Sequence, residues 1–310
     1  INMKVIIIGG VAGGASCAAR LRRLDEKAEI LLLERGPFVS YANCGLPYYV
    51  GGVIENESSL LVATKEMFQT QFAIDCRTNS EVIDINATTK TVIIKNRLNG
   101  EVTTESYDKL VLSPGSAPIR PPLPGIELEG IFSVRTDKKK KNIKKWLNKN
   151  VSLSGLNEYS SIDVLSKPKR AVVIGGGFIG LEMVENFIDL GLEVTLLEKL
   201  NQVMPPLDAE MAKVVKNYME KRGVKVVLSD GVSGFKAAEN GSLEVLTELG
   251  KVLPADVVIL AIGVRPETAL AKMAGIEIGE RGGMRVDENM RTSNPDIFAV
   301  GDAVVIQVFI

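Results

Sequence analysis

The sequence predicts an α/β fold with two similar parallel-sheet domains. The chain has 310 residues, a length that suits about two domains. A pattern of apolar strand, glycine-rich loop, helix, second strand and glutamate begins at Val5 and again at Ala171. Apolar runs without polar alternation, such as 5–8 and 171–174, indicate strands that are buried on both faces of a parallel sheet. Two complete copies at nearly equal spacing argue against two chance glycine-rich turns.

Composition and charge exclude several classes of function. Lys plus Arg number 37 and Asp plus Glu number 38, so the chain lacks the basic excess of a nucleic-acid-binding protein. No apolar run approaches the roughly 20 residues of a membrane span, and the first residues do not resemble a signal peptide. We therefore expect neither a nucleic-acid partner nor a membrane partner.

The rare residue types narrow the chemistry further. The chain has no histidine, which excludes histidine-ligated metals and histidine acid–base catalysis within it. The three cysteines, Cys17, Cys44 and Cys76, form no C-x-x-C pair and no zinc-binding spacing. An odd number of unpaired cysteines fits a reducing compartment. We expect no metal site and a cytoplasmic location.

The first copy of the pattern predicts a dinucleotide site. Its loop, GGVAGG at 9–14, lies between a strand and a helix, and the following strand ends at Glu34. Glycines let backbone N–H groups approach a pyrophosphate at the helix N-terminus. Glu34 occupies the position from which a carboxylate accepts hydrogen bonds from ribose hydroxyls. Val11 replaces the middle glycine, and we expect its Cβ to displace the phosphates slightly, which favours a site of the flavin type.

The second copy predicts a site for another dinucleotide. Its loop, GGGFIG at 175–180, matches G-x-G-x-x-G, and a helix over 181–190 is predicted to follow. Glu198, at the end of the next strand, would bind the ribose 2′-hydroxyl and repel a 2′-phosphate. This favours NADH over NADPH, although the adjacent Lys199 leaves NADPH open. Two dinucleotide sites in one chain suggest two cofactors that exchange electrons, FAD in the first and a nicotinamide nucleotide in the second.

Two later segments support the FAD assignment. A strand at 109–112 runs into Pro114 and Gly115, and a second strand ends at Gly301 and Asp302. Ligands of such folds bind beyond the carboxyl ends of the strands. The Asp302 carboxylate is therefore expected either to accept a hydrogen bond from a ribityl hydroxyl or to cap a following helix.

The motifs GGVAGG, SPGSAP, GGGFIGLE, AIGVRPET and TSNPDIFAVGDA together resemble the FAD-dependent pyridine nucleotide-disulfide oxidoreductase family. The stretch SYANCGLPY at 40–48 is most similar to coenzyme A-disulfide reductases and NADH-dependent persulfide reductases. The resemblance implies two Rossmann-like domains, with an NAD(P)H domain at 119–262 inserted into an FAD domain at 1–118 and 263–310. It also implies a homodimer formed through a C-terminal interface domain, which we expect to be absent from this chain.

Cys44 is the predicted redox centre. The resemblance places it at the start of a helix beside the flavin, and a helix N-terminus favours the thiolate. Family members with two cysteines carry the second one five residues later, where this chain has Tyr49. Cys44 must therefore pair with an external sulfur or with oxygen as a sulfenic acid. Cys17 and Cys76 are interpreted as structural side chains.

The resemblance also assigns substrate and cofactor residues. Phe72 stands where some coenzyme A-disulfide reductases carry a lysine. Glu182 lies near the nicotinamide in the family, but it also fits a first-turn glutamate favoured by the helix dipole. Arg20 and Arg23 are expected to bind coenzyme A phosphates, unless they are solvated like Arg22. The substrate-binding residues implied are Ser16, Arg20, Arg23, Ser40 and Asn43. The cofactor-binding residues implied are Gly9, Gly10, Val11, Ala12, Gly14, Glu34, Arg35, Asn43, Val82, Pro114, Gly115, Gly301 and Asp302, together with Gly175, Gly177, Phe178, Ile179, Gly180, Glu182, Glu198 and Gly263.

We therefore expect an enzyme that passes hydride from NADH through FAD to Cys44, which reduces coenzyme A disulfide or a persulfide. An NADH oxidase or peroxidase with a cysteine sulfenic acid is the nearest alternative. A non-catalytic flavin-binding redox module is another. A thioredoxin-reductase-like enzyme would need a C-x-x-C pair, which is missing. The basic run at 138–141 is predicted to lie on a solvated helix face, with Ile143 and Leu147 pointing inward.

Overall fold

The computed structural model describes residues 2–134, 143–148 and 168–306. They form two compact units, the first within 2–42, 58–117 and 264–306 and the second within 43–57, 118–134, 143–148 and 168–263. The basic run at 138–141 lies outside the described residues. Residues 43–57, which carry Cys44, belong to the second unit, whereas the sequence placed the whole of 1–118 in the first.

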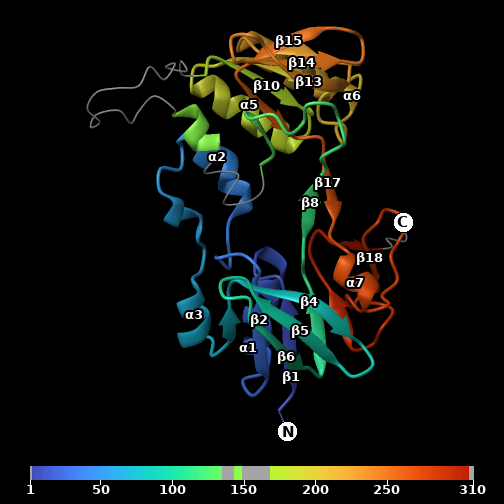
Figure 1. The fold of residues 1–310 in the computed structure, drawn as a ribbon. Helices are drawn as coiled ribbons and strands as arrows, with labels where there is room; N and C mark the ends of the chain where they lie inside the picture. The colour runs from blue at the N-terminus through green and yellow to red at the C-terminus, as the bar shows by residue number, and fades with distance from the viewer. Residues whose placement is uncertain (1, 135–142, 149–167, 307–310) are drawn as a thin grey trace, which may run out of the picture. The chain divides into compact units, whose positions relative to one another are not determined.

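The first unit is built on a five-stranded parallel sheet (Figure 1). The strand order is β19-β7-β1-β2-β3. Continuous apolar sequences such as Ile6 to Ile8 and Leu31 to Leu33 form its buried centre, as expected for parallel strands covered on both faces. The strands are β1 (Lys4–Ile8), β2 (Glu29–Leu33), β3 (Asp75–Arg77), β7 (Lys109–Leu112) and β19 (Ile297–Ala299).

Alternate side chains of β1 and β2 enter two different cores. Val5 and Ile7 pack with Ala15 and Ala18 of α1 (Ala12–Leu24). Ile6 and its neighbours pack with apolar residues of a three-stranded antiparallel sheet that covers the other face. That sheet consists of β4 (Ser80–Asn86), β5 (Thr91–Asn96) and β6 (Val102–Ser106). The remaining elements of this unit are η2 (Glu57–Leu60), α3 (Lys65–Thr70), β8 (Ser116–Pro118), β17 (Val264–Pro266), α7 (Ala269–Met273), β18 (Met284–Val286) and β20 (Val304–Ile306).

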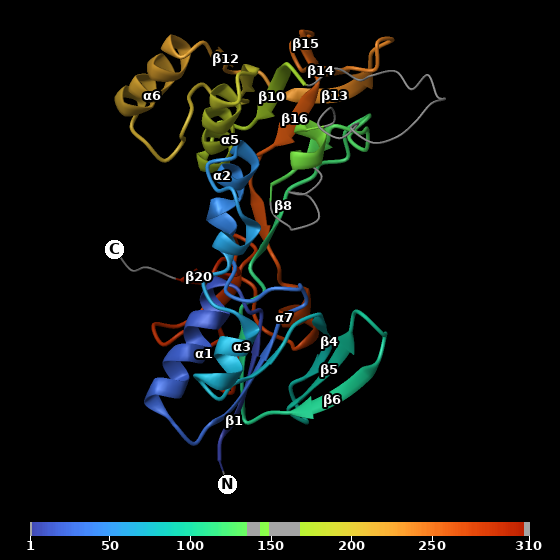
Figure 2. The same ribbon diagram turned by 90° about the vertical axis from the view of Figure 1, so that its left-hand side faces the viewer.

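The second unit repeats this plan. Its parallel sheet has the order β12-β11-β10-β16-β9. One face packs against α5 and α6, and the other packs against a second antiparallel sheet, β13-β14-β15 (Figure 2). The elements are η1 (Asn43–Gly45), α2 (Leu46–Gly51), β9 (Ile131–Phe132), β10 (Arg170–Ile174), α5 (Phe178–Asp189), β11 (Glu193–Leu197), α6 (Ala209–Lys221), β12 (Lys225–Val227), β13 (Val232–Ala237), β14 (Leu243–Thr247), β15 (Val252–Ala255) and β16 (Val257–Leu260).

A short helical segment at 143–147 adds to the core of the second unit. Ile143 and Leu147 are buried in the same apolar cluster as Val173 and Phe187. The predicted inward orientation of these two side chains is confirmed.

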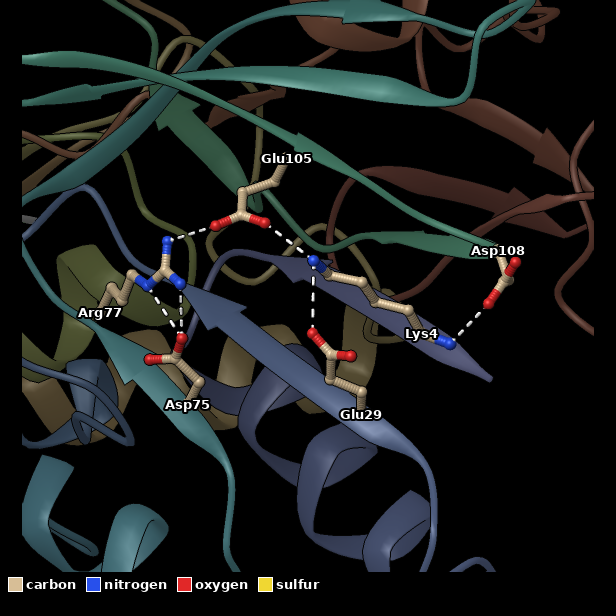
Figure 3. A network of polar contacts seen from close by, with 6 residues as sticks. All are labelled: Lys4, Glu29, Asp75, Arg77, Glu105 and Asp108. Carbon is tan, nitrogen blue, oxygen red and sulfur yellow. Dashed lines mark hydrogen bonds and ion pairs between the residues drawn. The ribbon is translucent and has the colours of Figure 1, made fainter. Parts of the chain in front are cut away.

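At one rim of the first unit, a polar network connects the parallel sheet to strand β6 of the antiparallel sheet (Figure 3). Lys4 Nζ lies 2.8 Å from Glu105 Oε2 and 3.3 Å from Glu29 Oε1. Arg77 donates to the other oxygen of Glu105 at 2.9 Å and also pairs with Asp75. Asp108 accepts the backbone N–H of Lys4. Glu105 on β6 is therefore held by cations from β1 and β3 of the parallel sheet.

Candidate functional site

The first glycine-rich loop is a tight connection whose glycines are required by close backbone approaches. Gly9 has φ 97°, and a Cβ there would overlap the carbonyl group of Ser113. A Cβ on Gly14 would overlap the carbonyl oxygen of Gly9, so α1 packs directly against the end of β1. The helix begins at Ala12, three residues earlier than the sequence indicated, which brings its free N–H groups to the loop.

The second loop has the same construction. Gly175 has φ 107°, and its Cβ would overlap the carbonyl oxygen of Ala261, while a Cβ on Gly180 would overlap that of Gly175. A Cβ at Gly177 would meet nothing within 4 Å. The middle position of the second loop could therefore carry a side chain without a clash with the protein. The equivalent position of the first loop does carry one, that of Val11.

A buried glutamate ties each loop to the next strand. Glu34 Oε2 accepts the N–H of Gly10 at 2.8 Å, and Oε1 accepts that of Gly36 at 2.6 Å. Glu198 Oε2 accepts the N–H of Gly176 at 2.5 Å, and Oε1 accepts that of Leu200 at 2.7 Å. Every carboxylate oxygen keeps a second lone pair. Both side chains can therefore hold the loop and still accept hydrogen bonds from a ribose.

The duplication continues beyond the two glutamates. Ser40 donates its N–H to the carbonyl of Gly10 at 2.7 Å, and Met204 donates to that of Gly176 at 2.8 Å. Both residues have positive φ, 47° and 48°. Ser40 therefore belongs to the framework of the first loop, whereas Asn43 and Cys44 lie in the second unit.

Three strand ends converge beside the first loop. Ser113 donates its N–H to Ile8, and Val300 donates to Leu112, so the ends of β1, β7 and β19 lie side by side. The sheet order reverses between β1 and β7, which is the switch point where ligands bind in such sheets. Residues 113–115 and 300–302 follow these strand ends, with Gly115 at φ 74° and Gly301 at φ 81°.

Asp302 has an oriented carboxylate. Its Oδ2 accepts the Ser116 hydroxyl at 3.2 Å, and the carboxylate itself is exposed. No helix follows within the described part of the chain, because the next element is the strand β20. Within the described residues, Asp302 therefore does not cap a following helix.

Two other predicted cofactor residues have clear structural contacts. Arg35 forms an ion pair with Glu267 at 2.9 Å, within the first unit. The Val82 side chain is buried in the core between the parallel sheet and the antiparallel sheet. The Val82 side chain is therefore not available to a ligand.

The predicted substrate residues of α1 share one exposed face. Ser16, Arg20 and Arg23 are exposed at helical spacing. Arg23 lies over the ring of Phe72, with its guanidinium carbon 5.7 Å from the ring centroid. Phe72, where the sequence departs from the family, thus forms a cation–π pair with Arg23, which is predicted to bind a phosphate.

Arg22 makes different contacts from Arg20 and Arg23. Its guanidinium donates to the backbone carbonyls of Phe72 and Ala73 and to those of Asp25 and Glu26. These contacts fasten the end of α1 to the segment before β3. The presence of Arg22 therefore does not show that Arg20 and Arg23 are merely solvated.

The three cysteines have three different environments. Cys44 is exposed in the η1 turn that leads into α2, Cys17 is partly buried, and Cys76 is fully buried. Burial raises the pKa of the Cys17 thiol and raises that of Cys76 to about 11. The structural interpretation of Cys17 and Cys76 agrees with this burial. Cys44 is the accessible thiol of the chain.

Glu182 does not lie in the first turn of its helix. α5 begins at Phe178 rather than at 181, so Glu182 occupies the second turn. Partial burial, followed by the charge of Glu185, raises the pKa of its carboxyl group, whereas a helix N-terminus would lower it. The interpretation of Glu182 as a helix-dipole residue is therefore wrong. Phe178 and Ile179, ahead of it, are exposed beside the loop.

Two features are absent from the described residues. They contain no cluster of three or more His, Cys, Asp or Glu residues that could hold a metal ion. None of their helices is both long enough and apolar enough to cross a bilayer.

Comparison with known proteins identifies relatives along the whole chain. Residues 3–309 match the family model described as pyridine nucleotide-disulphide oxidoreductase. An NADH oxidase of Enterococcus faecalis is 36% identical over 98% of this chain and 64% of its own length. A coenzyme A disulfide reductase of Staphylococcus aureus is 33% identical over 96% of this chain and 63% of its own length. The chain thus spans slightly less than two thirds of these curated relatives.

Solved structures show the same relationship. The structure of reduced Bacillus anthracis CoADR-RHD superposes with a TM-score of 0.89 at 48% identity, covering 98% of this chain and 51% of that one. The structure of an NAD-dependent persulfide reductase from A. fulgidus gives a TM-score of 0.87 at 38% identity, covering 97% of this chain and 53% of that one. The two glycine-rich loops, the duplicated parallel sheets and the family match along the chain lead to one conclusion: the chain belongs to the pyridine nucleotide-disulphide oxidoreductase family.

Proposed function

We propose that this chain is the redox core of an FAD-dependent NADH oxidoreductase that reduces coenzyme A disulfide or a persulfide through Cys44. The observation that carries the proposal is the pair of loops with the same geometry, each tied to a buried glutamate, in a chain with one exposed cysteine. Two dinucleotide sites would let electrons pass from one cofactor to the other. The one accessible thiol would then pass them to a sulfur substrate.

The first unit fits FAD. The N–H groups of Gly9 and Gly10 already donate to Leu33 and Glu34, so the free N–H groups at the start of α1 would meet the pyrophosphate. Glu34 would hold a ribose, and Asp302, oriented by Ser116, would accept a ribityl hydroxyl. When bound, FAD takes a hydride from a reduced nicotinamide and returns two electrons to sulfur.

The second unit fits a nicotinamide nucleotide, and we propose NADH. The Glu198 carboxylate is buried at the loop, where it would oppose a 2′-phosphate. Lys199 is the nearby cation that would favour NADPH. Its Nζ forms an ion pair with Glu248 Oε1 at 2.8 Å, so its charge is already matched by an acid.

The thiol chemistry can be written as two balanced steps. The Cys44 thiolate attacks the substrate disulfide, a Cys44–substrate disulfide forms, and one substrate thiolate leaves. Two electrons and one proton then cleave the new sulfur–sulfur bond, which releases the second thiol and restores the thiolate. With a persulfide the first leaving group is hydrosulfide. The chain has no neighbouring second cysteine, so the external sulfur completes the disulfide.

The exposed face of α1 supports a phosphate-bearing substrate. Arg20 and Arg23 present two guanidinium groups, and Arg23 is oriented by its stacking on Phe72. Guanidinium groups bind phosphates through paired hydrogen bonds. We therefore propose that Ser16, Arg20 and Arg23 bind the phosphates of coenzyme A and that Ser40 and Asn43 orient the reacting sulfur.

Steady-state kinetics tests the proposal. NADH consumption by the purified protein is measured with coenzyme A disulfide, with a coenzyme A persulfide and without either acceptor. Activity on either sulfur acceptor that is lost in Cys44→Ser and kept in the matched control Cys17→Ser supports the proposal. Equal activity in Cys44→Ser and the parent would remove Cys44 from the mechanism.

The likeness to an NADH oxidase supports a second candidate function. In that case the exposed Cys44 thiol would cycle through a sulfenic acid and oxygen would be the electron acceptor. Oxygen consumption that matches NADH loss, unchanged by added coenzyme A disulfide, would favour this second candidate.

A further inference from the structure

We infer that Gly51 and Asn186 are a positioning pair that couples the Cys44 turn to the second glycine-rich loop. Their contact fixes α2 on α5, so that nucleotide binding at the loop restrains the Cys44 thiol and slows its reaction with external reagents. This inference rests on the proposed function only in assuming that a nicotinamide nucleotide binds the second loop.

The helix that follows Cys44 packs on the helix that follows the second loop. α2 lies against α5 in both ribbon views (Figures 1 and 2), and both helices belong to the second unit. Val50 on α2 is buried in the same apolar cluster as Met183 and Phe187 on α5. The position of the Cys44 turn is therefore set by α5.

The closest approach of the two helices is at Gly51. A Cβ there would overlap Oδ1 of Asn186 and would lie 2.6 Å from its Cγ and 2.8 Å from its Cβ. Rotation of the asparagine side chain can move Oδ1 and Cγ away. It cannot move Cβ, which is fixed by the α5 backbone, so any side chain at 51 forces the helices apart.

Burial and a hydrogen bond within α5 hold the Asn186 side chain in place. The residue is 2% exposed, and its Nδ2 donates to the backbone carbonyl of Glu182 at 2.8 Å. Asparagine is a poor residue for a helix interior, so its helix propensity does not account for it here. Its side-chain amide packs against Gly51, the one residue of α2 without a side chain.

A second contact lies one turn earlier along the same interface. Burial, and after it the charges of Glu182 and Glu185, raise the pKa of the Tyr48 phenol, so these two α5 carboxylates act electrostatically on α2. α2 is thus attached to α5 through Tyr48, Val50 and Gly51.

The two ends of this helix pair are the two groups that the inference connects. α5 begins at Phe178, directly after Gly177 of the second loop. α2 begins at Leu46, directly after the η1 turn that contains Cys44. A ligand that restrains the start of α5 therefore restrains the Cys44 turn through the buried packing of α2 on α5.

The test measures the alkylation of Cys44 by iodoacetamide with peptide-resolved mass spectrometry, with and without saturating NAD⁺. Cys17, in the first unit, serves as an internal reference. In the parent protein NAD⁺ is expected to slow Cys44 alkylation by about fivefold or more, the usual lower size of a coupling between two sites. In Gly51→Ala the NAD⁺ effect is expected to disappear, and Cys44 is expected to react faster than in the parent without nucleotide.

Two further variants keep the inference falsifiable if Gly51→Ala folds poorly. Gly51→Ala with Asn186→Gly removes all three clashing atoms and is expected to restore the NAD⁺ effect. Asn186→Ala alone removes the amide without a clash and is expected to weaken the effect. Circular dichroism and thermal unfolding report the fold of each variant. A parental NAD⁺ effect in Gly51→Ala, or a double variant without recovery, would overturn the inference.

Calorimetry of NAD⁺ binding separates this inference from the proposed function. If NAD⁺ binds and Cys44 alkylation is unchanged in the parent, the coupling is wrong and the proposed function stands. If NAD⁺ and NADH both fail to bind, the nucleotide assignment of the second loop is wrong, and the coupling is wrong with it.

Discussion

Glu34 and Glu198 occupy the same place in the two halves of the chain. Each carboxylate accepts the backbone N–H of the second glycine in its own loop and the backbone N–H of the residue two positions after the glutamate itself. In each half the residue that binds the ribose in the proposed function is also the residue that shapes the loop. A substitution of either glutamate is therefore expected to affect stability and cofactor binding together.

Glu34→Ala is the first test of this double role. Loss of the carboxylate leaves the N–H groups of Gly10 and Gly36 without their partner, which costs about 1–3 kcal/mol per buried group. We expect a lower unfolding temperature and a lower flavin-to-protein ratio after purification, measured by calorimetry and absorbance. Glu101→Ala, an exposed glutamate on the same unit, is the control. Full flavin content in Glu34→Ala would contradict the assignment.

The rim network predicts an acid-dependent stability. Lys4 first, and Arg77 with it, lower the pKa of the Glu105 carboxyl group. A folded-state pKa below the unfolded value contributes stability above the unfolded pKa, and this contribution is lost as pH falls through the folded pKa. Glu105→Gln should lower the unfolding free energy at neutral pH by about 1–2 kcal/mol, and the difference from the parent should shrink as the pH falls below the ordinary glutamate pKa of 4.5. Urea unfolding at several pH values checks this. A pH-independent difference would exclude the electrostatic explanation.

The thiol environments predict an order of reactivity. At pH 8 Cys44 should be alkylated first, because it is exposed, and Cys76 should remain unmodified, because it is buried with a pKa of about 11. Peptide mass spectrometry over time gives the three rates separately. Modification of Cys76 before Cys44 in the folded protein would contradict the described placement of both thiols.

The ion pair of Lys199 predicts a change in nucleotide preference. Glu248→Ala removes the acid that holds the lysine, so the lysine becomes available to a 2′-phosphate. We expect the NADPH-to-NADH ratio of kcat/KM to rise by up to about fivefold, the upper size of an exposed charge contact. Glu239→Ala, on the same unit and exposed, should leave the ratio unchanged. An unchanged ratio in Glu248→Ala would mean that Lys199 does not face the 2′-position.

The sequence predicted those parts of the fold that depend on local pattern. Continuous apolar runs predicted the parallel strands, because such strands are buried on both faces. The glycines predicted the loops, because Gly9 and Gly175 take backbone conformations that other residues avoid. Both glutamates were identified from their spacing alone, and the structure places each at its loop.

What the sequence did not predict depends on contacts between distant segments. Nothing local shows that Gly51 meets Asn186, that Arg22 binds carbonyls around Phe72, or that residues 43–57 pack with the second unit. The start of α5 was also missed, because Phe178 and Ile179 follow a glycine loop and resemble its continuation. An asparagine within the apolar pattern of α5 was the one available signal of a special contact.

The most direct test of the central claim follows the flavin absorbance of the parent and Cys44→Ser in single-turnover experiments without oxygen. NADH should bleach the flavin in both proteins. Addition of coenzyme A disulfide or coenzyme A persulfide should restore the colour rapidly in the parent and should leave Cys44→Ser bleached. Equal recovery in both proteins, or a parent flavin that NADH does not bleach, would contradict the account.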